Sequence, residues 1–290
     1  MFAGFTEFDV PTSEGSIHGR RGGSGPPVLL LHGIPETHLM WHHVAPGLAE
    51  RFTVVATDLR GFGDSRTPPA EPDHRPHSMR AIAAEQVEVM ASLGFDRFAV
   101  AGHDRGARCA YRMALDHADT VTRLAVLDVI PTGETYRRAD KNFSLSYWIW
   151  SFLAAPAPVP ERLIGTDPAV LVNHMLDTWA DDPSVFPEAI RSQYIAKFRD
   201  PGTVAAICEE YRAAATLDVA HDDQDRGRRT IRCPVLVLWS ATGATGTGYD
   251  FLAIWGEWAG DVTGTGLDCG HFLPEEAPGP TTAQLLGFLT

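Results

Sequence analysis

The pentapeptide Gly102-His103-Asp104-Arg105-Gly106 is the clearest chemical signal in the sequence. It stands between an apolar run typical of a buried strand and a stretch with helical spacing. Glycines on either side permit a strained turn that projects the central side chain at the end of the strand. An aspartate there is already anionic at neutral pH and can attack carbon without first losing a proton. On the pentapeptide alone, a tight turn in which Asp104 caps the helix is an equally good interpretation.

Three further groups follow the chain order that a hydrolytic site of this kind requires. Ile34 lies in the loop after the apolar run at 27–31, and the backbone N–H groups of Ile34 and Arg105 are candidates for an oxyanion hole. Asp128 ends a later strand-like run, and His271 follows the last strand region. A histidine base needs a carboxylate that sets its tautomer, so these two residues are the predicted acid and base. Taken singly, Asp128 has the alternative explanation of a capping residue or a solvated strand end, and His271 that of a surface-loop histidine.

Two arginines beside the aspartate indicate an anionic substrate. Arg105 and Arg108 fall in the first turn of the expected helix, where the positive end of the helix dipole disfavours cations unless an anion lies opposite. Their spacing places both on one face, and guanidinium groups bind carboxylates with two-point geometry. Either arginine has the alternative of pairing with a structural carboxylate.

Short apolar runs provide the elements that would position these groups. Helix-like stretches at 79–93 and 105–118 alternate with such runs, which predicts an α/β fold with a mostly parallel sheet and right-handed crossovers. We expect the first 20 residues to form an antiparallel hairpin at the sheet edge. The predicted buried strands are 27–33, 52–58, 97–104, 123–130 and 234–240.

The alternation stops after Ile130. Residues 131–218 contain aromatic-rich segments and no convincing buried strand, so we predict an inserted helical cap there. Residues 1–130 and 219–290 would form the α/β core. The cap would cover the loops at one end of the strands, where open α/β sheets bind ligands.

Composition narrows the possible partners and the compartment. With 44% hydrophobic and 21% charged residues among 290, the chain has the composition of a folded globular protein. A formal charge of −13 disfavours nucleic acid and anionic membrane as partners. The four cysteines are scattered, which argues against a zinc site and a disulfide framework. The N-terminus shows no targeting segment, so a cytoplasmic location is expected.

Six motifs extend over most of the chain and together resemble a known family. The chain is similar to capped α/β-hydrolase-fold enzymes, and among these to the fluoroacetate (haloacetate) dehalogenases. The resemblance implies Asp104 as nucleophile, His271 as base and Asp128 as its orienting acid, with Arg105 and Arg108 holding the substrate carboxylate. It also implies a homodimer that needs no metal or organic cofactor. The motifs are HGIPETHLMWHHVAP (32–46), DLRGFGDSRTP (58–68), GHDRGAR (102–108), LDVIPT (127–132), WSFLAAPAPVPE (150–161) and CGHFLPEEAP (269–278).

The same resemblance implies a halide pocket in the cap, formed in the family by a histidine-tryptophan pair and a tyrosine. The matching positions are Ile149, Trp150 and Tyr211. Ile149 departs from the pattern, which has a histidine at this position. Isoleucine cannot donate a hydrogen bond to a leaving fluoride, so weak activity on fluoroacetate is expected. For Trp150 and Tyr211, packing within the cap is an equally good interpretation without the resemblance.

These observations predict a hydrolytic dehalogenase that converts small anionic organohalides, with water, into 2-hydroxy acids. An epoxide hydrolase is the nearest alternative, because it uses the same aspartate turn and activates the epoxide with cap tyrosines; Tyr136, Tyr147, Tyr194 and Tyr211 are available. A non-catalytic ligand-sensing scaffold of the same fold is a second alternative. Ester hydrolysis by serine is weaker, since Ser65 lies in an unrelated loop.

Overall fold

One eight-stranded sheet runs through the described part of the chain. The computed structural model describes residues 1–242 and 248–290. The strand order is β1-β2-β4-β3-β5-β6-β7-β8, and β2 is antiparallel to β1 and β4 while every other neighbouring pair is parallel. The predicted α/β class and the N-terminal hairpin are thereby confirmed. The strands are β1 Thr6–Pro11, β2 Ser16–Gly23, β3 Pro27–Leu31, β4 Thr53–Thr57, β5 Phe98–His103, β6 Val121–Leu127, β7 Val235–Ser240 and β8 Val262–Leu267.

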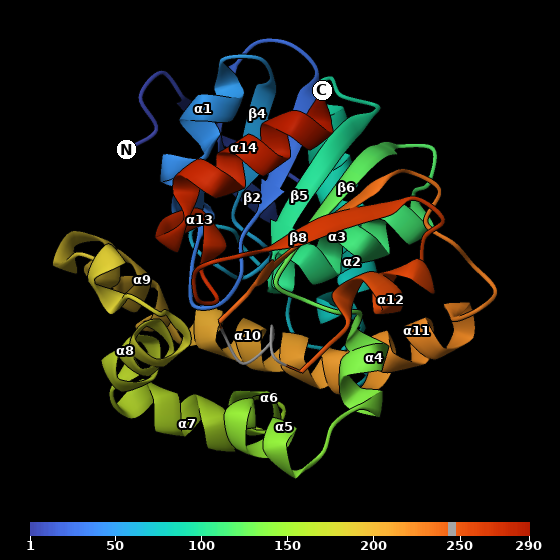
Figure 1. The fold of residues 1–290 in the computed structure, drawn as a ribbon. Coiled ribbons are helices and arrows are strands. Elements are labelled where there is room, and N and C mark those ends of the chain that lie inside the picture. The colour runs from blue at the N-terminus through green and yellow to red at the C-terminus, as the bar shows by residue number, and fades with distance from the viewer. Residues whose placement is uncertain (243–247) are drawn as a thin grey trace.

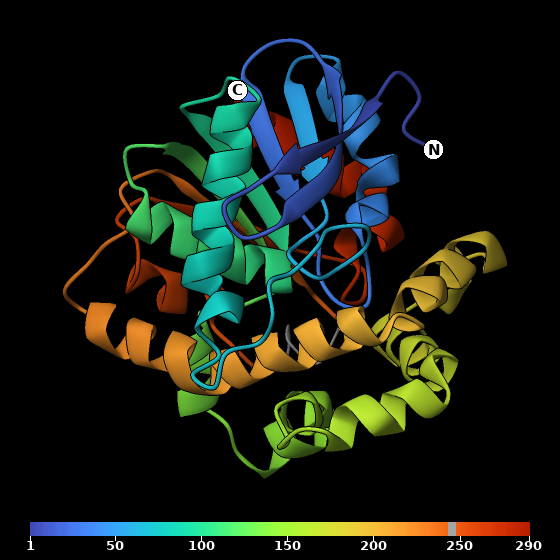
Figure 2. The ribbon, with the colours of Figure 1, turned by 180° about the vertical axis from the view of Figure 1, so that it is seen from behind.

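Helices cover both faces of this sheet, which is why its central strands are continuous apolar runs. On one face lie α1 (Ala45–Ala49) and α14 (Pro278–Leu289), and on the other lie α2 (Met79–Ser92) and α3 (Arg105–Asp116) (Figures 1 and 2). Every residue of β4 and β5 is buried. Strand β8 was not predicted, because its sequence VTGTGL is rich in glycine and threonine and it lies half-buried at the sheet edge.

The chain between β6 and β7 is helical and gathers at one end of the sheet (Figure 1). We keep 131–218 as the proposed cap. Within it lie α4 Thr132–Arg137, α5 Lys141–Ser146, α6 Trp148–Leu153, α7 Val159–Thr166, α8 Pro168–Trp179, η3 Pro183–Val185, α9 Glu188–Phe198, α10 Pro201–Ala213 and the π-helical turn η4 Ala214–Asp218. Helix α11, Val219–Asp225, follows it. The remaining helices are η1 His38–His43, η2 Arg75–His77, α12 Phe251–Gly256 and α13 Leu273–Glu276.

The state of the cysteines and the length of the helices can be read from the structure. The four described cysteines are free and buried. Within the described residues, no helix combines the length and apolar character needed to cross a membrane.

Candidate active site

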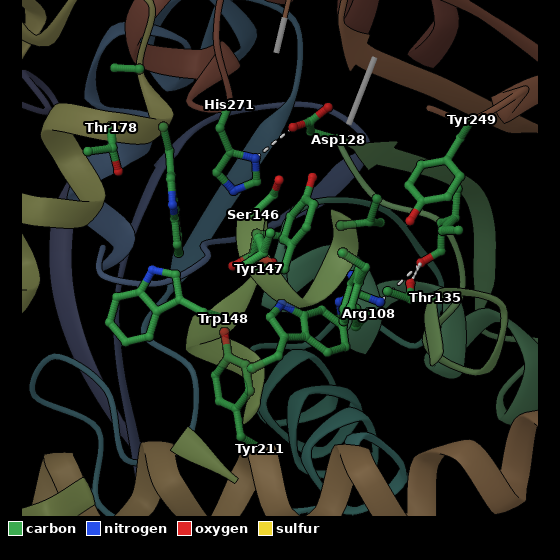
Figure 3. Close-up of a pocket in the computed structure, with 18 of the residues that line it drawn as sticks. Arg108, Asp128, Thr135, Ser146, Tyr147, Trp148, Thr178, Tyr211, Tyr249 and His271 are labelled. Carbon is green, nitrogen blue, oxygen red and sulfur yellow. Dashed lines mark hydrogen bonds and ion pairs between the residues drawn. The ribbon is translucent and has the colours of Figure 1, made fainter. Parts of the chain in front are cut away.

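A cavity of about 410 Å³ brings the predicted chemical groups together (Figure 3). Asp104, Asp128 and His271 line it from turns that follow β5, β6 and β8, and Arg108 lines it from α3. Figure 3 shows Tyr211 reaching in from α10 on the side opposite His271. Seven further lining residues are phenylalanines, tyrosines or tryptophans: Phe143, Tyr147, Trp148, Trp150, Trp179, Tyr249 and Phe251.

Asp104 occupies a strained backbone conformation between β5 and α3. Its φ and ψ are 43° and −112°, a region that L-residues rarely adopt. Gly102 and Gly106 allow this turn because their backbones are in close contact. A Cβ on Gly102 would lie 2.3 Å from the Gly106 carbonyl oxygen, and a Cβ on Gly106 would lie 2.4 Å from the Leu31 carbonyl oxygen. The two glycines flanking the aspartate are therefore required by packing.

The Asp104 carboxylate is buried but held in its charged form. Burial opposes ionisation, yet the positive potential of His271, Arg105 and Arg108 lowers the pKa of Asp104 below its ordinary value. Its Oδ2 accepts a hydrogen bond from the Ile34 backbone N–H at 3.2 Å. The carboxylate is therefore anionic at neutral pH, and a predicted oxyanion-hole donor already contacts one of its oxygens.

His271 and Asp128 form a directed pair. Nδ1 of His271 lies 2.6 Å from Oδ2 of Asp128, and Oδ1 of Asp128 accepts the backbone N–H of Ser240 at 3.0 Å. Because a carboxylate can only accept, Nδ1 carries the proton and Nε2 is left as the basic nitrogen. Burial lowers the pKa of His271, but the hydrogen bond and charge of Asp128 outweigh it and raise the pKa above its ordinary value.

The two predicted clamp arginines have different surroundings. Arg108 lines the cavity, and its guanidinium donates to the Ile130 carbonyl at 3.0 Å and to Thr132 Oγ1 at 3.2 Å. Arg105 is fully buried, pairs through Nε with Glu210 of α10, and is not among the cavity-lining residues. Its other two guanidinium nitrogens have no hydrogen-bond partner among the described residues. Pairing with a structural carboxylate, the alternative left open for either arginine, is thus found at Arg105.

The predicted halide pocket is only partly assembled at the cavity. Trp150 and Tyr211 line it, with their ring centres 5.9 Å apart and perpendicular. The guanidinium carbons of Arg108 and Arg105 lie 4.5 Å from the ring centres of Trp150 and Tyr211 respectively. Ile149 is buried and does not line the cavity. Its neighbours Tyr147 and Trp148 do, which no pattern in the sequence distinguished from ordinary aromatic packing.

A separate cluster brings three metal-ligand atoms within 4.8 Å of one another, from His18, His38 and Asp58. His38 is already engaged on both sides, because Nε2 accepts from Arg20 Nε at 3.1 Å and Nδ1 lies 2.8 Å from Asp58. A cation there would have to displace the arginine. We therefore infer no metal site from this cluster.

Comparisons with known proteins agree with this architecture. The family model of the alpha/beta hydrolase fold matches residues 26–278. A fluoroacetate dehalogenase from Burkholderia sp is 41% identical over 291 residues, covering 100% of this chain and 95% of that protein. A soluble epoxide hydrolase from Corynebacterium sp. (strain C12) is 33% identical over 269 residues, covering 90% of this chain and 89% of that protein.

The fold is also similar to that of a solved structure. The crystal structure of an alpha/beta hydrolase candidate from Nostoc sp PCC 7120 is similar with a TM-score of 0.98 and 50% identity, covering 100% of this chain and 99% of that one. The sheet order, the strained aspartate turn and these similarities over the full chain all point to the same fold family. The chain belongs to the alpha/beta hydrolase family and, within it, to the members that resemble fluoroacetate dehalogenase.

Proposed function

We propose that this hydrolase is a dehalogenase acting on 2-halo acids of the haloacetate type. The observation that carries the proposal is the presence, in one cavity, of an anionic aspartate nucleophile and a buried arginine, Asp104 and Arg108. An aspartate suits attack on a carbon that bears a leaving group, and the arginine suits a substrate carboxylate. The name of the Burkholderia relative supports the same reaction class.

In the first step, an Asp104 oxygen attacks the carbon that bears the halogen. A carbon–oxygen bond forms as the carbon–halogen bond breaks, and the halide leaves with the bonding electron pair. Arg108 holds the substrate carboxylate so that the attack is in line. The Trp150 N–H and the Tyr211 O–H are the proposed donors to the departing halide.

In the second step, Nε2 of His271 removes a proton from water, and the hydroxide attacks the carboxyl carbon of the Asp104 ester. The backbone N–H groups of Ile34 and Arg105 stabilise the resulting oxyanion. Collapse of this intermediate breaks the bond between the carboxyl carbon and the substrate oxygen, and that oxygen takes the proton from His271 to give the 2-hydroxy acid. The Asp104 carboxyl group then loses its proton to solvent, which restores the carboxylate. Asp128 balances the positive charge that His271 gains.

Two measurements test this reaction. Ion-selective detection should find chloride and bromide released from the corresponding haloacetates, and fluoride released more slowly because Ile149 supplies no donor. In oxygen-18 water, a single turnover should place the label in Asp104 rather than in the product, since water attacks the aspartyl carbon. Absence of halide release, or label in the product after one turnover, would contradict the proposal.

Epoxide hydrolysis is the second candidate, favoured because two of the cap tyrosines available for it, Tyr147 and Tyr211, line the cavity. Tyr194 is not available for this role because it is buried against Glu275 and does not line the cavity. Diol formation from a terminal epoxide, with no halide released from haloacetates, would support this reading. If neither assay shows turnover, a ligand-binding role for the same cavity remains to be tested by calorimetry with haloacetates.

A further inference from the structure

Four buried side chains form a row behind His271, outside the mechanism above. They are Tyr194 on α9, Glu275 on α13, Glu36 after β3 and His103 at the end of β5. None of them lines the cavity, and each is at most 5% exposed. Two carboxyl groups so deeply buried need a specific reason to be there.

Hydrogen-bond distances connect the row to the backbone of His271. Nε2 of His103 lies 2.8 Å from the His271 carbonyl oxygen, and Nδ1 of His103 lies 3.2 Å from Glu36 Oε2. At the other end, the Tyr194 hydroxyl donates to Glu275 Oε1 at 3.0 Å. The side chains of Glu36 and Glu275 are within hydrogen-bonding contact of each other. Glu36 Oε1 and Glu275 Oε2 find no donor among the described residues, so only a proton on a carboxyl group can join them.

The chemistry of each group sets the direction of these bonds. A carbonyl oxygen only accepts, so Nε2 of His103 carries a proton. Burial lowers the pKa of His103 to about 4, so the ring is neutral and Nδ1 must accept. Glu36 is then the donor, and burial raises the pKa of its carboxyl group to about 8. Burial also raises the pKa of Glu275, which donates to Glu36 in turn.

Burial is the main reason why both acids stay neutral, and the charges that face the row add to it at Glu36. Asp104 and Glu276 face Glu36, and Asp104 and Asp128 face His103 together with the imidazole of His271. Asp58 faces Tyr194 at the far end, and the His32 ring faces His103. Another anion in this row would be repelled by these carboxylates and would make His271 more basic.

We propose that Glu36 and Glu275 are positioning residues for His271, which as neutral acids hold the backbone of the base through His103 without adding a charge behind it. The inference rests on the proposed function, because it takes His271 as the base. When Glu36 loses its proton at alkaline pH, it can no longer donate to His103. The tautomer of His103 then changes, and the bond to the His271 carbonyl is lost.

The kinetic test compares four proteins in single-turnover hydrolysis of the ester from about pH 6 to about pH 9. The parent rate should fall as pH rises through about 8. E36Q should remove this alkaline decline, because its amide N–H still donates to His103 but cannot ionise. E36A should slow ester hydrolysis about tenfold below about pH 8, the scale of one lost buried hydrogen bond, with the halide burst unchanged. At neutral pH, E275Q should hydrolyse the ester at the same rate as E36Q, because its amide N–H still donates to Glu36.

A second measurement does not depend on turnover. Nitrogen-15 NMR of the resting protein should show His103 protonated at Nε2 below about pH 8 in the parent and above it as well in E36Q. If haloacetates are not substrates, this spectrum still decides whether the row exists, so the two proposals fail separately. An alkaline decline that persists in E36Q, or a His103 protonated at Nδ1 at neutral pH, would overturn the inference. If E36A does not fold, E36Q and E275Q carry the test.

Discussion

At the residue scale, the proposed chemistry depends on the charge of one carboxylate. Asp104 stays anionic although it is only 6% exposed, because the cationic groups near it lower its pKa. An amide in the same place would keep the shape of the turn and lose the nucleophile. Replacing Asp104 by asparagine therefore tests the chemistry without changing the fold of the turn.

We expect D104N to lower halide release from chloroacetate by on the order of a thousandfold or more, because a neutral amide is a poor nucleophile toward carbon. Initial rates of chloride release measure this directly. The matched control is D119N, since the Asp119 side chain is fully exposed and should be dispensable. Multi-turnover release at the parental rate in D104N would remove Asp104 from the proposed mechanism.

H271N should have a different effect, because the base acts only on the ester. We expect a burst of about one halide per active site, followed by an arrested protein that is heavier by the carboxymethyl group. Quenched-flow halide detection and intact mass measure the two quantities. A protein that stops releasing halide without gaining mass would show that His271 has another role.

At the scale of elements, the turn between β5 and α3 is specified locally. Strand, glycine, aspartate, glycine and helix follow each other within a few residues, so sequence patterning predicted both the turn and the helix that follows it. The observed α3, Arg105–Asp116, lies within the predicted 105–118. By contrast, β8 is specified by its neighbour β7, and its own sequence carries little strand signal.

The close packing of this turn yields a stability prediction. G102A places a Cβ 2.3 Å from a backbone oxygen, and we expect it to lower the free energy of unfolding by about 1–3 kcal/mol or more. G165A is the matched control on α7, where an added Cβ meets no atom within 4 Å, and should stabilise by about 0.5–1 kcal/mol. Urea titration of both variants checks this. Equal shifts in the same direction would contradict the packing argument.

At the scale of the whole molecule, buried titratable groups set how stability depends on pH. Burial lowers the pKa values of His32, His77 and His103 to about 4, so these groups make the fold more stable as pH rises from about 4 to 6.5. Burial raises the pKa of Glu36 to about 8 and that of Asp218 to about 7. These acids stay protonated in the folded state at pH values where they ionise in the unfolded chain. They therefore make the fold less stable as pH rises from their ordinary pKa values to about 8 for Glu36 and about 7 for Asp218.

Above pH 6.5 these three histidines no longer contribute. The buried acids remain, together with His271, whose raised pKa acts in the same direction as theirs. We therefore expect the free energy of unfolding to fall between pH 6.5 and about 8, by up to about 1.4 kcal/mol per pH unit for each acid that stays protonated. Urea titrations across this range measure the slope, and E36Q should reduce it. A stability that rises over the same interval would show that Glu36 and Asp218 are ionised in the folded protein.

The sequence by itself determined the alternation of strands and helices in the core and the proposed nucleophile, acid and base, because strand–turn–helix patterns and the chain order of these groups are local or sequential. Only the tertiary structure decided which groups meet across the fold. Arg105 pairs with Glu210, 105 residues away, and Ile149 packs away from the cavity that its neighbours line. Glu36 and Glu275 come together from opposite ends of the chain. Such contacts depend on how helices pack against the sheet edge, and local periodicity carries no information about that packing.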